Sequence, residues 1–299
     1  MSKPIHQVSI GMPVYNGERF IREALDSLLA QTFTDFELII SDNASTDGTE
    51  AICREYAARD PRIRYVRQSE NRGAAANFQF VLNEAVGEYF MWAAHDDQFY
   101  KKHLEKLLKL HQQSFYIMTA SQPEFIELNS NKKFDFKKIP KSTFKGSRCE
   151  ILMKFIELHH WDYAKATIIY GLYRRKMMPQ FSISDDLADI GSDLLYLMET
   201  MVKGKIGFIP DVTWLRGERF YRPESFTRNI RFKYIKWLIY RYVPARLACK
   251  RHLAINTYFN RIGWLIRLSQ CNSKKLAKVI NNSEKEVVSL LFSRRWFLG

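Results

Sequence analysis

Residues 87–97 read GEYFMWAAHDD, an apolar run that ends in two adjacent carboxylates. The segment 88–94 has the composition of a buried strand, so Asp96 and Asp97 stand at the exit of a core strand. Two like charges repel each other there, and each needs a positive partner. A pair of carboxylates at a strand end suits a hard divalent cation, Mg²⁺ or Mn²⁺, which prefers oxygen ligands. The plainer alternative is a solvated turn, or an N-cap for the helix predicted at 101–112.

Short apolar runs alternate with amphipathic segments from residue 7 to about residue 120. The hydrophobic spacing predicts strands and helices in alternation, with strands at 7–12, 36–42, 63–68 and 88–94 and helices at 18–31, 49–60 and 77–86. This alternation indicates βαβ units, which form a parallel sheet with right-handed crossovers.

Polar residues follow three of the four predicted strands. Tyr15 and Asn16 follow the first strand, Asp42 and Asn43 end the second, and the acid pair follows the fourth. Ligands of such sheets bind at the carboxyl ends of the strands, so these residues predict a binding site at one edge. Neither GxGxxG nor GxxxxGK[ST] occurs, and we therefore expect a diphosphate to be held by a metal ion rather than by a helix N-terminus.

Three segments in this order resemble the nucleotide-binding half of family 2 glycosyltransferases: VSIGMPVYNG (8–17), QTFTDFELIISDNASTDGT (31–49) and ENRGAAANFQFVLNEAVGEYFMWAAHDD (70–97). The resemblance implies an α/β protein of the GT-A fold, with a Rossmann-like, mixed and mainly parallel sheet flanked by helices. It also implies a nucleotide-diphosphate sugar as donor, Mn²⁺ or Mg²⁺ as cofactor, and transfer with inversion.

The same resemblance implies roles for the acid pair and the first loop. Asp97 would bind the metal that bridges the donor diphosphate, and Asp96 would contact the ribose or the metal shell. Pro13, Tyr15 and Asn16 would line the nucleotide pocket, with the Tyr15 ring against the base.

Further nucleotide contacts are implied at the second strand exit. Asp42 stands where the family usually carries the first of two acids that read uracil and ribose. The second position is Asn43 here, a departure that makes UDP the preferred but not the only candidate nucleotide. Arg72 lies where a basic residue can meet the base or the phosphates, and the alternative is a solvated arginine.

The segments IYGLYRR (169–175) and ADIGSDLLYLMETMVKGKIGFIPDVTWL (188–215) resemble the acceptor-side block of the family, in which an acid opens a helix. Asp193 is then the general base that deprotonates an acceptor hydroxyl. The alternative for Asp193 is an acid that interacts with the helix dipole. Nearby acids are rivals for the role of base: Asp185, Asp186 and Asp189.

The basic residues are concentrated at the C-terminal end. Residues 227–299 hold 16 Lys and Arg and two Glu, which accounts for the whole net charge of +14. We therefore predict a GT-A domain at 1–226, with a nucleotide-sugar half (1–120) and an acceptor half (121–226), followed by a basic, aromatic, mainly helical segment at 227–299. This segment suits an anionic membrane surface, a helical appendage packed on the domain, or a dimer contact. Nucleic acid is the weakest option because no reader module is recognisable.

Four scattered cysteines, no signal segment and no apolar run near the ~18–20 residues of a membrane span predict a cytoplasmic protein, peripheral on the inner face of the membrane if the basic segment binds there. The predicted function is a metal-dependent inverting glycosyltransferase that moves a sugar, with UDP preferred as carrier, to a glycan or lipid-linked saccharide in surface polysaccharide biosynthesis. The alternative is a non-catalytic scaffold that binds nucleotide or carbohydrate.

Overall fold

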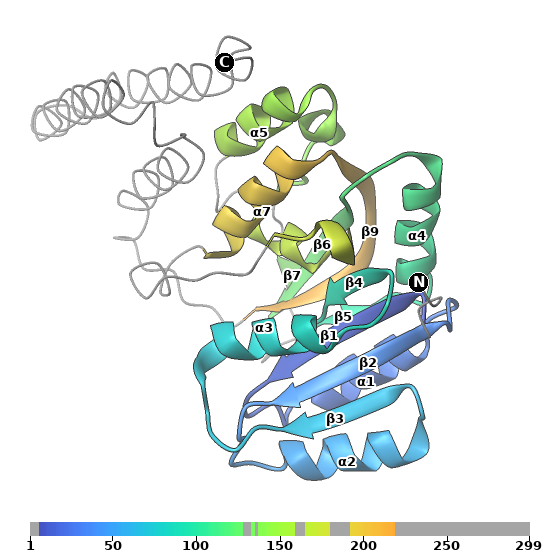
Figure 1. Cartoon of the computed structure of the whole chain (residues 1–299), viewed down its shortest axis with the longest axis vertical. Helices are drawn as coiled ribbons and strands as arrows, with labels where there is room; N and C mark the ends of the chain where they lie inside the picture. Colours follow the sequence, from blue (N-terminus) through green and yellow to red (C-terminus); the bar gives the residue numbers. More distant parts are fainter. Residues whose placement is uncertain (1–5, 128–132, 135–136, 159–164, 180–191, 219–299) are drawn as a thin grey trace, which may run out of the picture. The chain divides into compact units, whose positions relative to one another are not determined.

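The structure is a computed structural model (Figure 1), and it describes residues 6–127, 133–134, 137–158, 165–179 and 192–218. Within these residues a single nine-stranded sheet forms the centre of the fold. Its hydrogen-bonded order is β3-β2-β1-β4-β8-β6-β9-β5, and β7 pairs with β6 outside this path.

The first half alternates strands and helices, as the sequence predicts. Its elements are β1 (Val8–Val14), α1 (Ile21–Leu29), β2 (Phe36–Asp42), α2 (Thr49–Arg59), β3 (Ile63–Arg67), α3 (Gly73–Glu84) and β4 (Tyr89–Trp92). β1 pairs in parallel with both β2 and β4, and β2 pairs in parallel with β3. Every residue of β1 and β2 is buried, as expected for parallel strands covered by helices on both faces.

Alternate residues of the central strands face opposite layers of helices. Val8, Ile10 and Met12 of β1 pack in one apolar cluster with residues of α1, α2 and α4 (His103–Gln113). The helix α3 packs on the other face, where the Asn77 side chain donates to the carbonyl of Ser41 at 2.9 Å. The chain therefore crosses from β3 to β4 on the face opposite α1 and α2.

The pairing of β1 with β4 stops before the pairing of β1 with β2. The pairing of β1 with β4 ends at Gly11 and Trp92, whereas the pairing of β1 with β2 continues to Val14 and Asp42. The strand order reverses at the same place, because the chain runs from β1 outward to β3 and then returns to β4. Such a reversal is where open α/β sheets bind their ligands.

The second half contributes antiparallel as well as parallel strands. Its elements are β5 (Gln98–Phe99), α4, β6 (Met118–Glu127), β7 (Lys133–Phe134), η1 (Lys141–Phe144), α5 (Arg148–Glu157), η2 (Lys165–Tyr170), β8 (Leu172–Arg174), η3 (Arg175–Met177), α7 (Ser192–Lys203) and β9 (Ile206–Glu218). β8 runs antiparallel to β4 and β6, and β9 runs parallel to β6 and antiparallel to β5. Most paired residues lie in the parallel pairs, so the predicted mixed, mainly parallel sheet is confirmed.

The apolar composition of ATIIYGLYRR (166–175) predicts a single strand, but these residues form the end of η2 followed by the short β8. Gly171 lies between the two elements, where a Cβ atom would come within 2.5 Å of the carbonyl oxygen of Thr119. The apolar run ATIIY is therefore buried as a helical turn against β6. Its apolar composition alone does not distinguish a helical turn from a strand.

The sequence IGFIPDVTWLRGE (206–218), in which Pro210 and Asp211 interrupt two apolar runs, predicts a short hairpin or paired strands, whereas the structure has one long strand, β9. The turn-forming pair Pro210 and Asp211 makes a bulge instead of a reversal. The register with β6 moves there from Ser121–Ile209 to Gln122–Val212. Pairing with β6 on both sides of the bulge outweighs the local turn signal.

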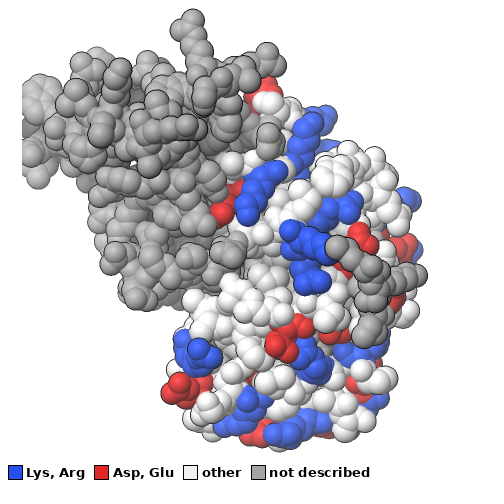
Figure 2. Space-filling model, in the orientation of Figure 1, with Lys and Arg blue, Asp and Glu red and all other residues white. Residues whose placement is uncertain are grey.

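The predicted segment 227–299, and with it the boundary at residue 226, lies outside the described residues, as do Asp185, Asp186 and Asp189. None of the helices in the described ranges has the length and hydropathy needed to cross a bilayer. Figure 2 shows Lys and Arg side chains beside Asp and Glu over much of the described surface in that view, in line with the equal charge counts of residues 1–226.

The helix α4 buries two histidines, His103 and His111, which are 1% and 2% exposed. Nδ1 of His103 lies 2.7 Å from Oγ1 of Thr213, and Nε2 of His111 donates to the carbonyl of Leu172 at 2.9 Å. Burial lowers the pKa of His103 to about 3 and that of His111 to about 4. Both rings therefore stay neutral in the folded protein at pH values where they are charged in the unfolded chain.

The folded pKa values lie below the unfolded value of ~6.5. As the pH falls through that value, the two histidines bind protons in the unfolded chain but not in the folded protein, so the free energy of unfolding decreases. A double variant, His103→Asn with His111→Gln, keeps a polar atom near each bonded ring nitrogen without titrating in this range. We expect wild-type stability, relative to the variant, to fall by about 2–4 kcal/mol from about pH 7.5 to about pH 5. Urea unfolding of both proteins at both pH values measures the difference in free energy of unfolding between wild type and variant. The contributions of other titrating groups are the same in both proteins and cancel in this difference. If the difference between wild type and variant is the same at both pH values, the two histidines are not buried in the neutral form.

Candidate functional site

The loops after β1 and β2 are hydrogen-bonded to each other at the carboxyl edge of the sheet. The Asn16 N–H donates to Oγ of Ser45 at 2.9 Å, and Oδ1 of Asn16 accepts from the Thr46 N–H at 2.9 Å. Asn16 has a φ of 50°, a left-handed conformation that asparagine adopts more readily than most residues. Tyr15 beside it is 44% exposed, which leaves its ring open to a ligand.

The loop after β1 also touches the loop after β4. A Cβ atom on Gly17 would lie 2.7 Å from Cδ2 of His95 and 2.7 Å from Cγ2 of Val14, so only glycine fits. This close approach brings His95, and the acid pair that follows it, next to Tyr15 and Asn16. The three strand exits predicted to share one edge are therefore in contact, with the buried Pro13 at the end of β1 beneath them.

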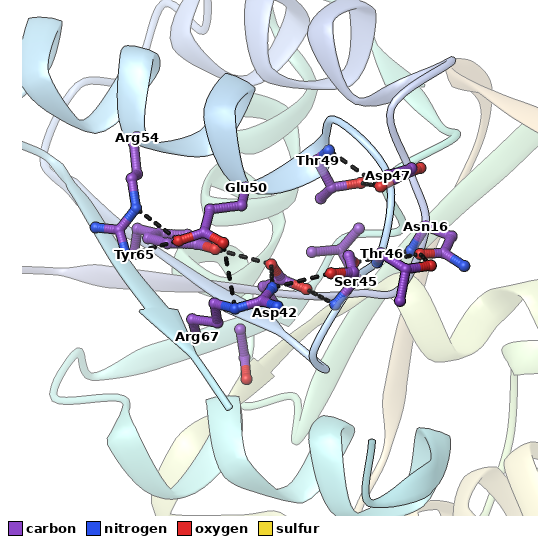
Figure 3. Close-up of polar contacts among 12 residues, drawn as sticks. Asn16, Asp42, Ser45, Thr46, Asp47, Thr49, Glu50, Arg54, Tyr65 and Arg67 are labelled. Atoms are coloured by element: carbon purple, nitrogen blue, oxygen red, sulfur yellow. Dashed lines mark hydrogen bonds and ion pairs between the residues drawn. The ribbon is translucent and has the colours of Figure 1, made fainter. Parts of the chain in front are cut away.

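Asp42, the last residue of β2, is fully buried and accepts three hydrogen bonds (Figure 3). Its Oδ1 accepts from the Ser45 N–H at 2.8 Å, and its Oδ2 accepts from the Tyr65 hydroxyl at 2.8 Å and from Nη1 of Arg67 at 3.1 Å. Burial and the adjacent carboxylate raise the pKa of Tyr65, so its hydroxyl remains a donor. Asp42 thus anchors this corner, and its contact with a base stays a prediction.

Arg67, at the end of β3, joins Asp42 to the helix α2. Its Nε lies 3.2 Å from Oε2 of Glu50, and Nη1 also donates to the Ser45 carbonyl at 3.1 Å. The side chain is 34% exposed, so the guanidinium separates the buried carboxylate from solvent. Sequence reasoning missed Arg67. The available signal was its place at the end of a predicted parallel strand, which puts it on the same edge.

Asn43 holds the loop that leads into α3. Its Oδ1 accepts from the Arg72 N–H at 3.0 Å, and its Nδ2 donates to Oδ1 of Asn71 at 2.7 Å and to the Gly73 carbonyl at 3.2 Å. Arg72 itself is exposed. Asn43 therefore sets the position from which Arg72 can reach a ligand, while the predicted ligand contacts of both residues stay predictions.

The two acids of the pair have different surroundings. Asp97 is fully buried, with Oδ2 3.2 Å from Nη1 of Arg216 and Oδ1 accepting from the Gly217 N–H at 3.2 Å. Burial raises the pKa of Asp97 to about 7, and the Arg216 charge opposes this rise. Asp96 is partly exposed, and within the described ranges no donor is hydrogen-bonded to its carboxylate. The positive partner of the pair is thus an arginine 119 residues farther along the chain.

The carboxylates at this edge fit a divalent ion that is held mainly by a substrate diphosphate. The described part of the chain has no group of three or more His, Cys, Asp or Glu side chains that could hold a metal ion. Ions bound together with phosphates commonly take only one or two protein carboxylates. Asp96 offers such a carboxylate, whereas both oxygens of Asp97 are bound to β9. Asp96 is therefore a second candidate ligand beside Asp97, whose predicted metal contact stays a prediction.

Asp193 is the second residue of α7, and the packing of this helix orients it. Tyr196, one turn later on the same face, packs edge-on against Trp92 of β4 with ring centroids 5.4 Å apart, and its ring lies 6.0 Å from that of Tyr173. The helix leads directly into β9, which runs in the same direction as β4 (Figure 1). The N-terminus of α7, with the half-buried Asp193, therefore lies toward the edge that carries Asp96.

The sequence matches the family model of glycosyl transferase family 2 over residues 9–173, more than half of the chain. The chain belongs to this family. It is 30% identical over 183 residues to an uncharacterized glycosyltransferase of Haemophilus influenzae, a match that covers 55% of this chain and 71% of that protein. The predicted family is therefore confirmed, and the chain carries a glycosyltransferase domain.

Other relatives match over a shorter region. The putative glycosyltransferase EpsE of Bacillus subtilis is 39% identical over 101 residues, which cover 33% of this chain and 36% of EpsE. An uncharacterized glycosyltransferase of Rickettsia typhi is 39% identical over 103 residues, which cover 34% of this chain and 31% of that protein. The match thus spans about a third of the length of these two relatives.

Solved structures share the fold at low sequence identity. TarS of S. aureus in complex with UDP superposes with a TM-score of 0.59 at 19% identity, over 80% of this chain and 66% of TarS. A mannosyltransferase of Pyrobaculum calidifontis in complex with GDP-Man and Mn²⁺ gives a TM-score of 0.50 at 16% identity, over 99% of this chain and 90% of that one. The predicted GT-A fold is confirmed by these likenesses.

The variant Arg67→Met tests whether Asp42 depends on its arginine. It leaves a buried carboxylate with only neutral donors, so we expect the free energy of unfolding to fall by more than in the control variant. Arg64→Met is a matched control on the same strand, because Arg64 pairs with the half-exposed Glu84 and should cost below about 1 kcal/mol. Chemical denaturation measures both. Equal losses would show that the charge of Asp42 does not need Arg67.

Proposed function

We propose that this chain is a metal-assisted, inverting glycosyltransferase that moves a sugar from a UDP-sugar to a hydroxyl group of a glycan or lipid-linked saccharide, in the assembly of a surface polysaccharide. The observation that carries the proposal is the contact of three strand exits at the carboxyl edge of β1 and β4, with the partly exposed Asp96 among them. Membership of glycosyl transferase family 2 supports the reaction class.

The nucleotide is proposed to lie across the ends of β1 and β2. Pro13 and Tyr15 would line its pocket, with the exposed Tyr15 ring stacking on the base. Asn16, Asp42 and Asn43 would shape the pocket wall through the hydrogen bonds that join their loops, and Arg72 would approach the base or the phosphates. The preference for UDP is supported by TarS, which has been solved in complex with UDP and with UDP-GlcNAc.

A divalent ion, Mn²⁺ or Mg²⁺, would be held by Asp96 together with the donor diphosphate, and when bound it would neutralise the charge that develops on the leaving group. Asp193 accepts the proton of the acceptor hydroxyl as that oxygen attacks the anomeric carbon. The new carbon–oxygen bond forms opposite the breaking bond to the diphosphate. A single displacement of this kind inverts the configuration.

The acceptor and the place of action are proposed from the basic C-terminal segment. A protein in the cytoplasm whose segment 227–299 binds an anionic membrane surface would meet a lipid-linked acceptor there. Packing of that segment as a helical appendage, or as a dimer contact, is compatible with the same reaction.

Calorimetric titration with UDP and with GDP, each with and without Mn²⁺, tests the donor site. We expect Mn²⁺ to strengthen UDP binding by at least about tenfold in the wild type, and we expect Asp96→Asn to lose this gain because the exposed carboxylate is removed. Glu88→Gln, an exposed acid at the other end of β4, is the control and should keep the gain. UDP binding by a wild type that transfers no sugar from any UDP-sugar tried would favour the scaffold alternative.

Asp193→Asn tests the general base. We expect kcat for sugar transfer to fall by roughly 100- to 10,000-fold, with UDP affinity unchanged, because the proton acceptor is lost while the donor site is intact. The matched variants Asp185→Asn, Asp186→Asn and Asp189→Asn change the rival acids and should each keep most of the activity. A large loss in one of these, with Asp193→Asn active, would assign the base elsewhere.

A further inference from the structure

The turn that carries the acid pair is held on β9 by four contacts. Asp97 binds the Arg216 guanidinium and the Gly217 N–H, as described above. The next two residues form β5, which pairs with β9 through Gln98–Leu215 and Phe99–Trp214. The rings of Phe99 and Trp214 are stacked, with centroids 5.8 Å apart and an interplanar angle of 11°. The position of this turn is therefore set by β9.

Arg216 is itself held in one orientation. Its guanidinium lies over the ring of Tyr170, 4.8 Å from the centroid, and Tyr170 packs against Trp214 at 5.8 Å. β9 is paired with β6 up to Glu218, so the backbone around Arg216 is also fixed. A planar guanidinium that is held over a ring and ion-paired in this way loses little further freedom when it orients a carboxylate.

The burial of Asp97 has a direct consequence for its neighbour. The Asp97 N–H donates to the Ala94 carbonyl at 3.4 Å, which closes a turn over residues 94–97. With Asp97 turned inward against β9, the adjacent Asp96 stays partly exposed at the edge. Without Arg216, the Gly217 N–H would be the donor left to Asp97 among its contacts in the described residues, and a buried, uncompensated carboxylate is strongly unfavourable.

We propose that Arg216 is a positioning residue, which through its ion pair with Asp97 holds the 94–97 turn so that the carboxylate of Asp96 faces the donor diphosphate. This inference rests on the proposed function, because it concerns the same donor site. Arg216 acts through Asp97 and does not itself contact the phosphates.

A positioning role for Arg216 predicts binding data that differ from those of a direct phosphate ligand and from those of a residue needed only for stability. A residue that only positions Asp96 affects the gain in UDP affinity that Mn²⁺ provides, and leaves the metal-free affinity alone. A direct phosphate ligand would lower the metal-free affinity as well. An arginine needed only for stability would lower the melting temperature and change neither affinity.

The experiment is calorimetric titration of the full chain with UDP, with and without Mn²⁺, combined with thermal unfolding. For Arg216→Met we expect the Mn²⁺ gain to shrink by at least about tenfold, since small displacements of a site residue are costly, and the metal-free UDP affinity to stay within about twofold. Arg216→Lys keeps the charge but lacks the planar, forked guanidinium, and we expect about a threefold smaller gain with the wild-type fold. This second variant keeps the test valid if Arg216→Met unfolds.

Arg174→Met is the matched control. Arg174 has the same exposed fraction, 21%, also pairs with an acid, Glu88 at 3.4 Å, and also lies over an aromatic ring, Phe115 at 4.9 Å, but it stands at the other end of β4. It should keep the full Mn²⁺ gain. If both Arg216 variants keep the full Mn²⁺-dependent gain in UDP affinity, the inference is overturned and the proposed function stands. The same holds if the UDP affinity without metal falls as much as the affinity with Mn²⁺. A wild type that binds no UDP under either condition would overturn the proposed function and the inference with it.

Discussion

The buried carboxylate of Asp97 is the constraint on which the edge of the sheet depends. A carboxylate without solvent must have a positive or hydrogen-bonding partner, and here both partners come from the far end of the described chain, in β9. The strand that supplies them also pairs with β5 and β6, so one interaction ties the loop after β4 to the second half of the sheet. The two halves of the GT-A domain are joined at the place where the donor site is proposed.

Polar side chains at the end of β2 are also used first for hydrogen bonds within the protein. Asp42 and Asn43 are residues that the sequence marks for ligand binding, yet each first satisfies backbone N–H groups of its own loops. Loops at a sheet edge expose such donors, and buried ones need acceptors. Asp42 and Asn43 therefore hold the shape of these loops, whereas Tyr15 and Arg72 beside them are exposed.

Aromatic packing orients the helix α7, as the ion pair of Asp97 with Arg216 orients the turn after β4. Trp92 ends β4 in the core, and its ring meets those of Tyr173 and Tyr196. Tyr196 shares a helix face with Asp193, so the orientation of α7 follows from this apolar contact. The end of the central strand β4 therefore helps to position both the proposed base, through the packing of α7 on Trp92, and the acid pair, which follows β4 in the chain.

The sequence by itself determined the family, the alternation of strands and helices through β4, and the set of strand exits that share one edge. These follow from local hydrophobic periodicity, from turn residues, and from a motif contained within residues 8–97. Only the tertiary structure decided which acid of the pair is buried, that Arg67 and Arg216 are the partners of Asp42 and Asp97, and that residues 206–218 form one strand. Each of these depends on a partner distant in sequence, 119 residues in the case of Asp97, and local patterns carry no information about such partners.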